Sequence, residues 1–253
     1  MAEAMTQEVG PGVHRYADGL VNWYLIDDGG ELTMVDAGWP RSWPRVEAAI
    51  QGLGRAVTDV TAIVLTHAHP DHLGATEPAR KATGATVHVH QHEVDRAAGT
   101  AKGANPFTLV PSLAPTLWRP SALGFVLHAA ARGFMMPKWV SDVKPFASGE
   151  ELDVPGHPHA IPTPGHTEGH VSLHFPERGV VITGDAIATL DVLTRATGPR
   201  LMPDALNGDP SRTRSSLDAL AALDAQTLLP GHGEPFTGSP ADAVARAREQ
   251  DAG

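Results

Sequence analysis

The chain has 253 residues, of which 42% are hydrophobic, so it can bury a sizeable core as one large domain or two small ones. Its 29 acidic and 19 basic side chains give a formal net charge of −10, which argues against a nucleic-acid surface because such surfaces gather Lys and Arg. It contains no cysteine, which excludes disulfides and thiolate metal ligands.

No apolar run approaches the roughly 20 residues that span a bilayer. Residues 1–12 are polar and lack the apolar centre of a signal peptide. We therefore expect a cytoplasmic protein that acts on a small molecule, with no membrane and no nucleic acid as partner.

The first elements predict antiparallel strands that lead into a carboxylate loop. Residues 22–26 and 32–35 are strand-like, and Asp27-Asp28-Gly29-Gly30 between them is a strong signal for a hairpin turn. The second strand runs into Asp36-Ala37-Gly38. Residues 42–54 are then typical of a helix, with Ser42 as the N-cap.

Residues 61–65 form an apolar run that predicts a buried strand, and Thr66-His67-Ala68-His69-Pro70-Asp71-His72 follows it directly. In an extended segment His67 and His69 point to the same side. The adjacent Asp71 and His72 point to different sides, so they can reach a second metal-binding position. Four such side chains would remain unpaired in a core unless a cation satisfied them. The stretch therefore predicts a metal site, with ligands for two ions.

A helix at 76–83, a strand at 85–90 and a helical stretch at 92–98 come next. The strand carries histidines at alternate positions, but no carboxylate loop accompanies them, so we interpret them as structural. Residues 99–146 differ from the rest because they contain six of the 13 aromatic side chains. We expect a helical or loop insert that serves as a lid, pocket wall or homodimer surface, with Trp118 and Phe134 in the substrate pocket; the alternative is that it only packs on the core.

From residue 147 the strand pattern returns, with strands expected at 152–154, 159–161, 171–175, 180–183 and 227–229 and helices at 210–223 and 240–249. His166, Asp185 and His232 each lie in a loop that follows one of these strands. Loops at strand ends let distant parts of a chain converge. Together with the first loop they supply five imidazoles and two carboxylates, a set that suits zinc.

These motifs resemble those of the metallo-β-lactamase superfamily. Residues 67–72 match its His-x-His-x-Asp-His signature, and residues 34–38, 164–170, 183–185 and 230–233 are similar to its other motifs in the same order. The resemblance covers about residues 13–236. It implies a four-layer αββα sandwich of two mixed β-sheets flanked by helices, formed as a single domain over residues 1–253 with the insert at about 99–146.

The resemblance also implies a role for each ligand. A first zinc would be held by His67, His69 and His166, a second by Asp71, His72 and His232, and Asp185 would bridge the two. Asp36 and His170 would support the ligands from behind. A metal-bound hydroxide would then cleave a small ester, thioester or lactone, with Asp71 as the proton carrier.

Several branches of the family fit less well. Glyoxalase II enzymes carry a C-terminal helical domain, but only 21 residues follow His232. Lactonases commonly use a tyrosine after the bridging aspartate, whereas Tyr16 and Tyr24 lie far upstream. The missing cysteine excludes one class of β-lactamase, and Asp185 argues against the others.

The alternatives that stay open are a persulfide dioxygenase with one iron, a β-lactam or phosphodiester hydrolase, and a domain that keeps metal only for stability. The dioxygenase would use His67, His166 and Asp185, together with His69 or His72.

Overall fold

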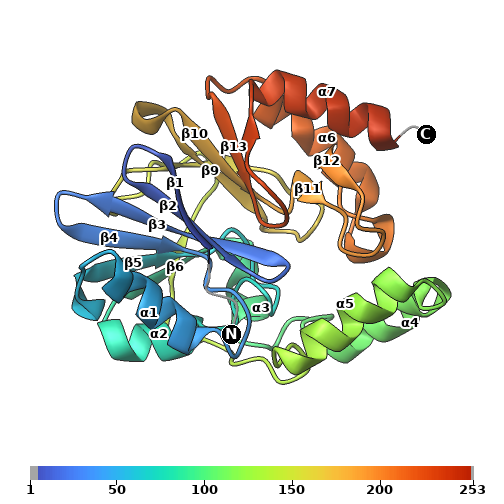
Figure 1. Ribbon diagram of the computed structural model, residues 1–253, viewed down its shortest axis with the longest axis horizontal. Helices are drawn as coiled ribbons and strands as arrows, with labels where there is room; N and C mark the ends of the chain where they lie inside the picture. Colours follow the sequence, from blue (N-terminus) through green and yellow to red (C-terminus); the bar gives the residue numbers. More distant parts are fainter. Residues whose placement is uncertain (1–4, 252–253) are drawn as a thin grey trace.

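The computed structural model describes residues 5–251. They form two mixed β-sheets packed face to face, with helices on both outer sides (Figure 1). The predicted four-layer α/β architecture is therefore confirmed. Within this part of the chain, no helix is long and apolar enough to cross a bilayer.

The first sheet has seven strands in the order β1-β2-β3-β4-β5-β6-β7. The pairs from β1 to β4 are antiparallel and those from β4 to β7 are parallel. The strands are β1 (Met5–Gly10), β2 (Val13–Asp18), β3 (Val21–Asp28), β4 (Glu31–Val35), β5 (Val60–Val64), β6 (Thr86–His90) and β7 (Lys144–Phe146).

The hairpin between β3 and β4 is confirmed, with a tighter turn than the four residues expected. Strand pairing continues to Asp28 and resumes at Glu31, so the loop consists of Gly29 and Gly30. Their φ angles are 65° and 110°, and such two-residue loops favour glycine because it adopts positive φ without a steric penalty.

The second sheet has five strands in the order β14-β13-β10-β9-β8, and a short ribbon of two strands lies beside it. The five strands are β8 (His159–Pro162), β9 (Val171–Phe175), β10 (Val180–Gly184), β13 (Thr227–Pro230) and β14 (Phe236–Thr237). The ribbon pairs β11 (Ala188–Leu190) with β12 (Thr197–Arg200).

The strand expected at 152–154 is wrong. Only Glu151 forms an isolated bridge, to His159, and the chain then bends. Pro155 has no N–H for a ladder, and Gly156 has a φ of 87°, outside the strand region. The apolar side chains of this segment fill the edge of the core from a turn.

Apolar clusters hold the layers together. Side chains of β3 and β9, such as Ile26 and Leu173, meet between the sheets. A second cluster packs the outer face of the first sheet against α1 (Trp43–Gly52), α2 (Thr76–Thr83) and α3 (Val94–Ala97). A third packs the second sheet against α6 (Pro210–Ala221) and α7 (Pro240–Asp251).

The segment from residue 99 is mainly helical and contains α4 (Val110–Leu113) and α5 (Pro120–Ala131) among short 3-10 turns. Its end differs from the expected boundary, because residues 144–146 are β7 and belong to the first sheet. We call residues 99–143 the insert. Figure 1 shows α4 and α5 together at one side of the molecule, on the same side as the β11–β12 ribbon. Phe125 of α5 packs in one cluster with Val192 and Met202, which flank that ribbon.

Candidate metal centre

The predicted ligands converge at one edge of the sandwich, where loops leave both sheets. The loop after β5 supplies four of them, and the loops after β8, β10 and β13 supply one each. All but His69 are buried. The seven residues are His67, His69, Asp71, His72, His166, Asp185 and His232.

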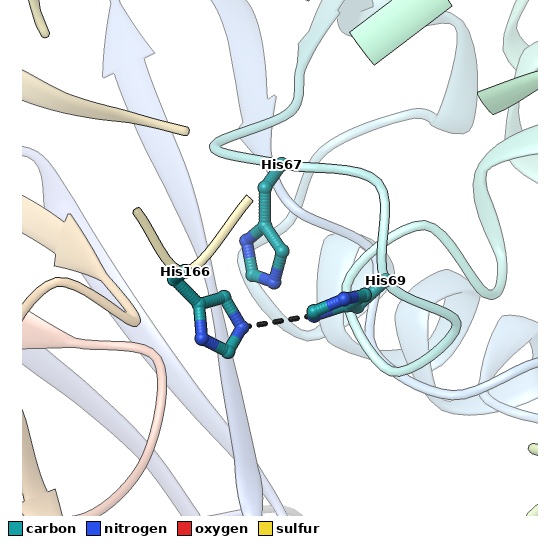
Figure 2. Close-up of side chains that lie close together, drawn as sticks. All are labelled: His67, His69 and His166. Carbon is teal, nitrogen blue, oxygen red and sulfur yellow. Dashed lines mark hydrogen bonds between the residues drawn. The ribbon is translucent and has the colours of Figure 1, made fainter. Parts of the chain in front are cut away.

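His67, His69 and His166 form a first group, whose candidate ligand atoms lie within 4.8 Å of one another. Figure 2 shows the three rings turned toward one another, with Nδ1 of His69 2.9 Å from Nε2 of His166. Burial lowers the pKa of all three imidazoles, those of His67 and His69 well below the ordinary 6.5. At neutral pH each ring is therefore uncharged and offers a nitrogen lone pair.

Asp71, His72 and His232 form a second group with the same spacing. Nε2 of His232 lies 3.6 Å from Oδ2 of Asp71. Burial disfavours protonation of both histidines and is the largest single influence, but nearby carboxylates together outweigh it and raise the pKa of each: Asp185 and Asp36 at His72, and Asp185 and Asp71 at His232. Without a metal, a proton would therefore stay on these rings, and a bound cation would replace it.

Asp185 lies between the two groups. Its Oδ2 is 3.2 Å from Nε2 of His166 and 3.3 Å from Nε2 of His232. Its Oδ1 is 3.3 Å from Nε2 of His72. One carboxylate thus faces ligands of both groups, which is the arrangement expected of a bridge.

Three buried polar atoms of this site lack a hydrogen-bond partner: Nε2 of His67, Nε2 of His72 and Oδ1 of Asp185. An unsatisfied buried group costs about 1–3 kcal/mol, so three in one place are unfavourable unless something binds them. Divalent cations bound at the two ligand groups would accept these lone pairs, and imidazole with carboxylate suits zinc or a similar borderline metal. The residues present therefore fit a metal.

Asp36 orients one ligand from behind. Its Oδ2 accepts a hydrogen bond from Nδ1–H of His72 at 2.8 Å, and its Oδ1 accepts the backbone N–H of Thr66 at 2.9 Å. This holds His72 in the tautomer whose Nε2 is free for a metal. Nδ1–H of His232 donates to the carbonyl of Leu20 in the same way.

His170 supports the site from beside the first ligand group, with its ring centroid 5.0 Å from that of His67, and is not itself a member of either group. Its Nε2 accepts the backbone N–H of Asp185 at 3.0 Å, and its Nδ1–H donates to Oγ1 of Thr163 at 2.9 Å. Burial lowers its pKa to about 3, which keeps the ring neutral and able to accept. His170 therefore positions Asp185 between the two groups.

Two supporting residues escaped the sequence analysis. Asn207 accepts Nδ1–H of His166 at 3.0 Å. Glu93 is buried and accepts the backbone N–H groups of Ala68 and Gly169, both at 2.9 Å, so it joins two ligand loops. Asn207 lies in an irregular segment with no recognisable pattern, and Glu93 follows two polar residues at a helix start where an acid is unremarkable.

The loop that carries His232 is held by strands of the first sheet. Nδ2 of Asn22 donates to the carbonyls of Pro230 and Gly233 at 2.8 and 2.7 Å. The Tyr24 hydroxyl also donates to Pro230, at 2.7 Å. Tyr24 is thus engaged in the scaffold and is absent from the cavity wall described next.

A cavity of about 40 Å³ adjoins the ligands. Five of the ligands line it on one side, and the rest of its wall is apolar: Leu113, Phe125, Phe134, Val192, Met202 and Leu206.

The structure places one of the two predicted aromatic residues at this cavity. Phe134 lines it, as expected. Trp118 does not: its side chain is 77% exposed, with the Arg119 guanidinium 5.2 Å from the ring. Trp118 follows a short 3-10 turn that directs it outward, and Phe125 of α5 takes the inner position.

Residues 16–232 match the sequence profile of the metallo-beta-lactamase superfamily. The chain is 28% identical to the probable metallo-hydrolase YflN of Bacillus subtilis (strain 168), over 91% of this chain and 87% of that protein. It is 32% identical to a hydroxyacylglutathione hydrolase of Fuscovulum blasticum, over 81% of this chain and 59% of that enzyme. The chain therefore matches less than two thirds of that enzyme's length.

Solved structures show the same architecture. A metallo-beta-lactamase family protein from Thermus thermophilus superimposes with a TM-score of 0.61 at 30% identity, covering 92% of this chain and 73% of that one. A subclass B3 metallo-beta-lactamase of Bradyrhizobium japonicum superimposes with a TM-score of 0.68 at 18% identity, covering 98% and 92%. The second likeness is one of fold alone.

Proposed function

The chain belongs to the metallo-β-lactamase superfamily, and from that premise we propose that it is a zinc-dependent hydrolase with two metal ions, which cleaves a small ester, thioester or lactone. The observation that carries the proposal is the pair of three-residue ligand groups joined by Asp185 at the wall of an apolar cavity. Relatives named metallo-hydrolase and hydroxyacylglutathione hydrolase support the reaction class.

The first ligand group would hold one ion and the second group the other, with Asp185 between them. Bound zinc lowers the pKa of a coordinated water toward 7 and polarises a carbonyl oxygen. The supporting hydrogen bonds from Asp36 and Asn207 keep the imidazoles oriented for this task.

Asp71 would move the proton. Its carboxylate lines the cavity and lies beside His232. It would take the proton released when water attacks the carbonyl carbon and deliver it to the leaving oxygen or sulfur. No serine or cysteine nucleophile is required for this route.

The cavity wall supports an uncharged acyl group as substrate. Leu113, Phe125 and Phe134 face the ligands across the cavity, and none of them offers a hydrogen bond. A charged group in that position would lose its hydration without a partner. An acyl carbon chain has no polar group whose hydration would be lost there, and the burial of its apolar surface is favourable.

The test is metal analysis combined with hydrolysis assays on protein purified without chelator. We expect two zinc ions per chain, hydrolysis of an ester, thioester or lactone, and loss of turnover in His69→Ala with the fold retained. His88→Ala is the matched control, because His88 is a buried histidine outside the ligand groups. One iron per chain with oxygen uptake on a persulfide, and no hydrolysis, would overturn the proposal.

A further inference from the structure

We propose that the insert contains a second, wholly apolar subsite that binds the hydrocarbon tail of an amphiphilic acyl substrate. The inference rests on the proposed hydrolase function and specifies its substrate class: an ester, thioester or lactone with an unbranched tail. It is carried by a second cavity inside the insert and by its connection to the cavity at the metal centre.

The second cavity has a volume of about 60 Å³ and lies within the insert. None of its lining side chains carries a charge or a hydrogen-bonding group. Such a cavity holds water poorly and favours apolar guests, because a water molecule there would find no polar partners. Its lining residues are Pro106, Leu113, Leu117, Phe125, Val126, Ala129, Phe134 and Met135.

The two cavities share part of their walls. Leu113, Phe125 and Phe134 line both the cavity at the metal centre and the second cavity. A tail attached to a carbonyl at the ligands therefore meets these three side chains first and Val126 and Ala129 beyond them. The path leads from the polar side chains of the candidate metal ligands to the apolar side chains of the insert, which matches a substrate with a polar head and an apolar tail.

The wall of this path is anchored to the core. The edge of the Trp39 indole meets Phe134, with ring centroids 6.2 Å apart, and the backbone N–H of Phe134 donates to the carbonyl of Ala129 at 3.0 Å. Arg132, just after α5, donates to the buried Asp18 of β2. Because these contacts fix the wall in position, the cavity holds only a limited length of chain and can discriminate between tails of different lengths.

Esters of p-nitrophenol with acyl chains from two to twelve carbons test the length dependence. We expect kcat/KM to rise about fourfold for each methylene until the second cavity is filled, from about 0.8 kcal/mol per buried CH₂. Longer chains should then show no further gain. A flat profile from acetyl to dodecanoyl would contradict the inference.

Two neighbouring positions of α5 provide a matched pair of variants. Val126 lines the second cavity, whereas Leu127 is 61% exposed. Val126→Phe should fill the cavity and lower the ratio of octanoyl to acetyl turnover at least tenfold. Leu127→Phe adds a ring to the exposed face and should keep the wild-type ratio. Val126→Ala should move the start of the plateau to longer chains, and it guards against a folding defect in the larger variant.

A binding measurement separates this inference from the proposed function. Octan-1-ol and butan-1-ol are titrated calorimetrically into the protein as purified, because neither alcohol contains a bond that the enzyme could hydrolyse. We expect octan-1-ol to bind at least tenfold more tightly, with a negative heat-capacity change, and Val126→Phe to abolish the difference.

Ester hydrolysis without octanol binding or chain-length preference would overturn the tail subsite and leave the hydrolase intact. Octanol binding in a protein that cleaves no acyl substrate would leave the subsite and overturn the proposed function.

Discussion

At Asp36 a single carboxylate holds the loop after β5 at two points. The residue follows β4 with a φ of 58°, a left-handed conformation that Asp and Asn tolerate better than most side chains. One oxygen fixes the backbone of Thr66, just before the ligand loop, and the other fixes the ring of His72. The orientation of a candidate metal ligand thus depends on a residue outside the two ligand groups.

Asp36→Asn is expected to weaken metal binding with little change in the fold. The amide oxygen can still accept from Thr66, but the amide nitrogen would face Nδ1–H of His72 and favour the tautomer with its proton on Nε2. We expect the protein's affinity for the more weakly bound metal ion to fall about 10- to 100-fold. This is the usual effect of changing a residue that orients a metal ligand.

Competition with a chromophoric chelator measures that affinity, and Asp153→Asn, at an exposed carboxylate, is the control. Wild-type affinity in Asp36→Asn would show that the carboxylate does not set the tautomer.

At the level of elements, a largely buried ion pair helps to attach α5 to the sandwich, beside its apolar contacts. The Arg132 guanidinium donates to Asp18, which is 3% exposed. The backbone carbonyl of Arg132 also accepts the backbone N–H of Arg41 at 3.2 Å. The buried Asp18 also lies 3.7 Å from the Arg45 guanidinium and accepts from the Ser42 hydroxyl. Arg132 therefore links the insert to the first sheet.

Arg132→Gln should loosen the insert and leave the metal centre intact. The change removes a charge from a largely buried pair, but Arg45 and Ser42 still partner Asp18, so we expect the free energy of unfolding to fall by about 2 kcal/mol. Hydrogen exchange should become faster across residues 106–134, while metal content stays the same. Arg119→Gln, at a surface arginine, is the matched control. Equal exchange rates in both variants would show that the pair does not hold the insert.

Across the whole molecule, the ligands come from both sheets. The loop after β5 of the first sheet contributes four, and the loops after β8, β10 and β13 of the second contribute three. Strands of the first sheet also hold the His232 loop through Asn22 and Tyr24. Ions bound here would join the two halves of the sandwich.

Metal removal should therefore lower global stability. Binding to the folded state alone stabilises it by about 2.7 kcal/mol when free metal is 100-fold above its Kd, and a chelator removes that contribution. Urea unfolding with and without chelator measures the difference. His67→Ala, which lacks one ligand, should respond less to the chelator. Superimposable curves for the wild-type protein would mean that metal contributes nothing to folding.

The local patterns of the chain were sufficient to predict much of this architecture. Short apolar runs bounded by turn residues located most strands, and helix 76–83 was predicted at its observed bounds. The ligand motif at 67–72 could be recognised because its meaning depends on spacing within a few residues. The order of the later motifs then identified His166, Asp185 and His232, each directly downstream of a strand.

What the sequence determined by itself was therefore most of the longer elements and the chemical type of the site, since both follow from short-range apolar patterns and side-chain chemistry. Only the tertiary structure decided that Phe125 lines the cavity while Trp118 faces solvent, and that Glu93 and Asn207 support the ligand loops. Burial and pairing of these residues depend on segments that are distant in the chain, and no local pattern encodes which segments those are.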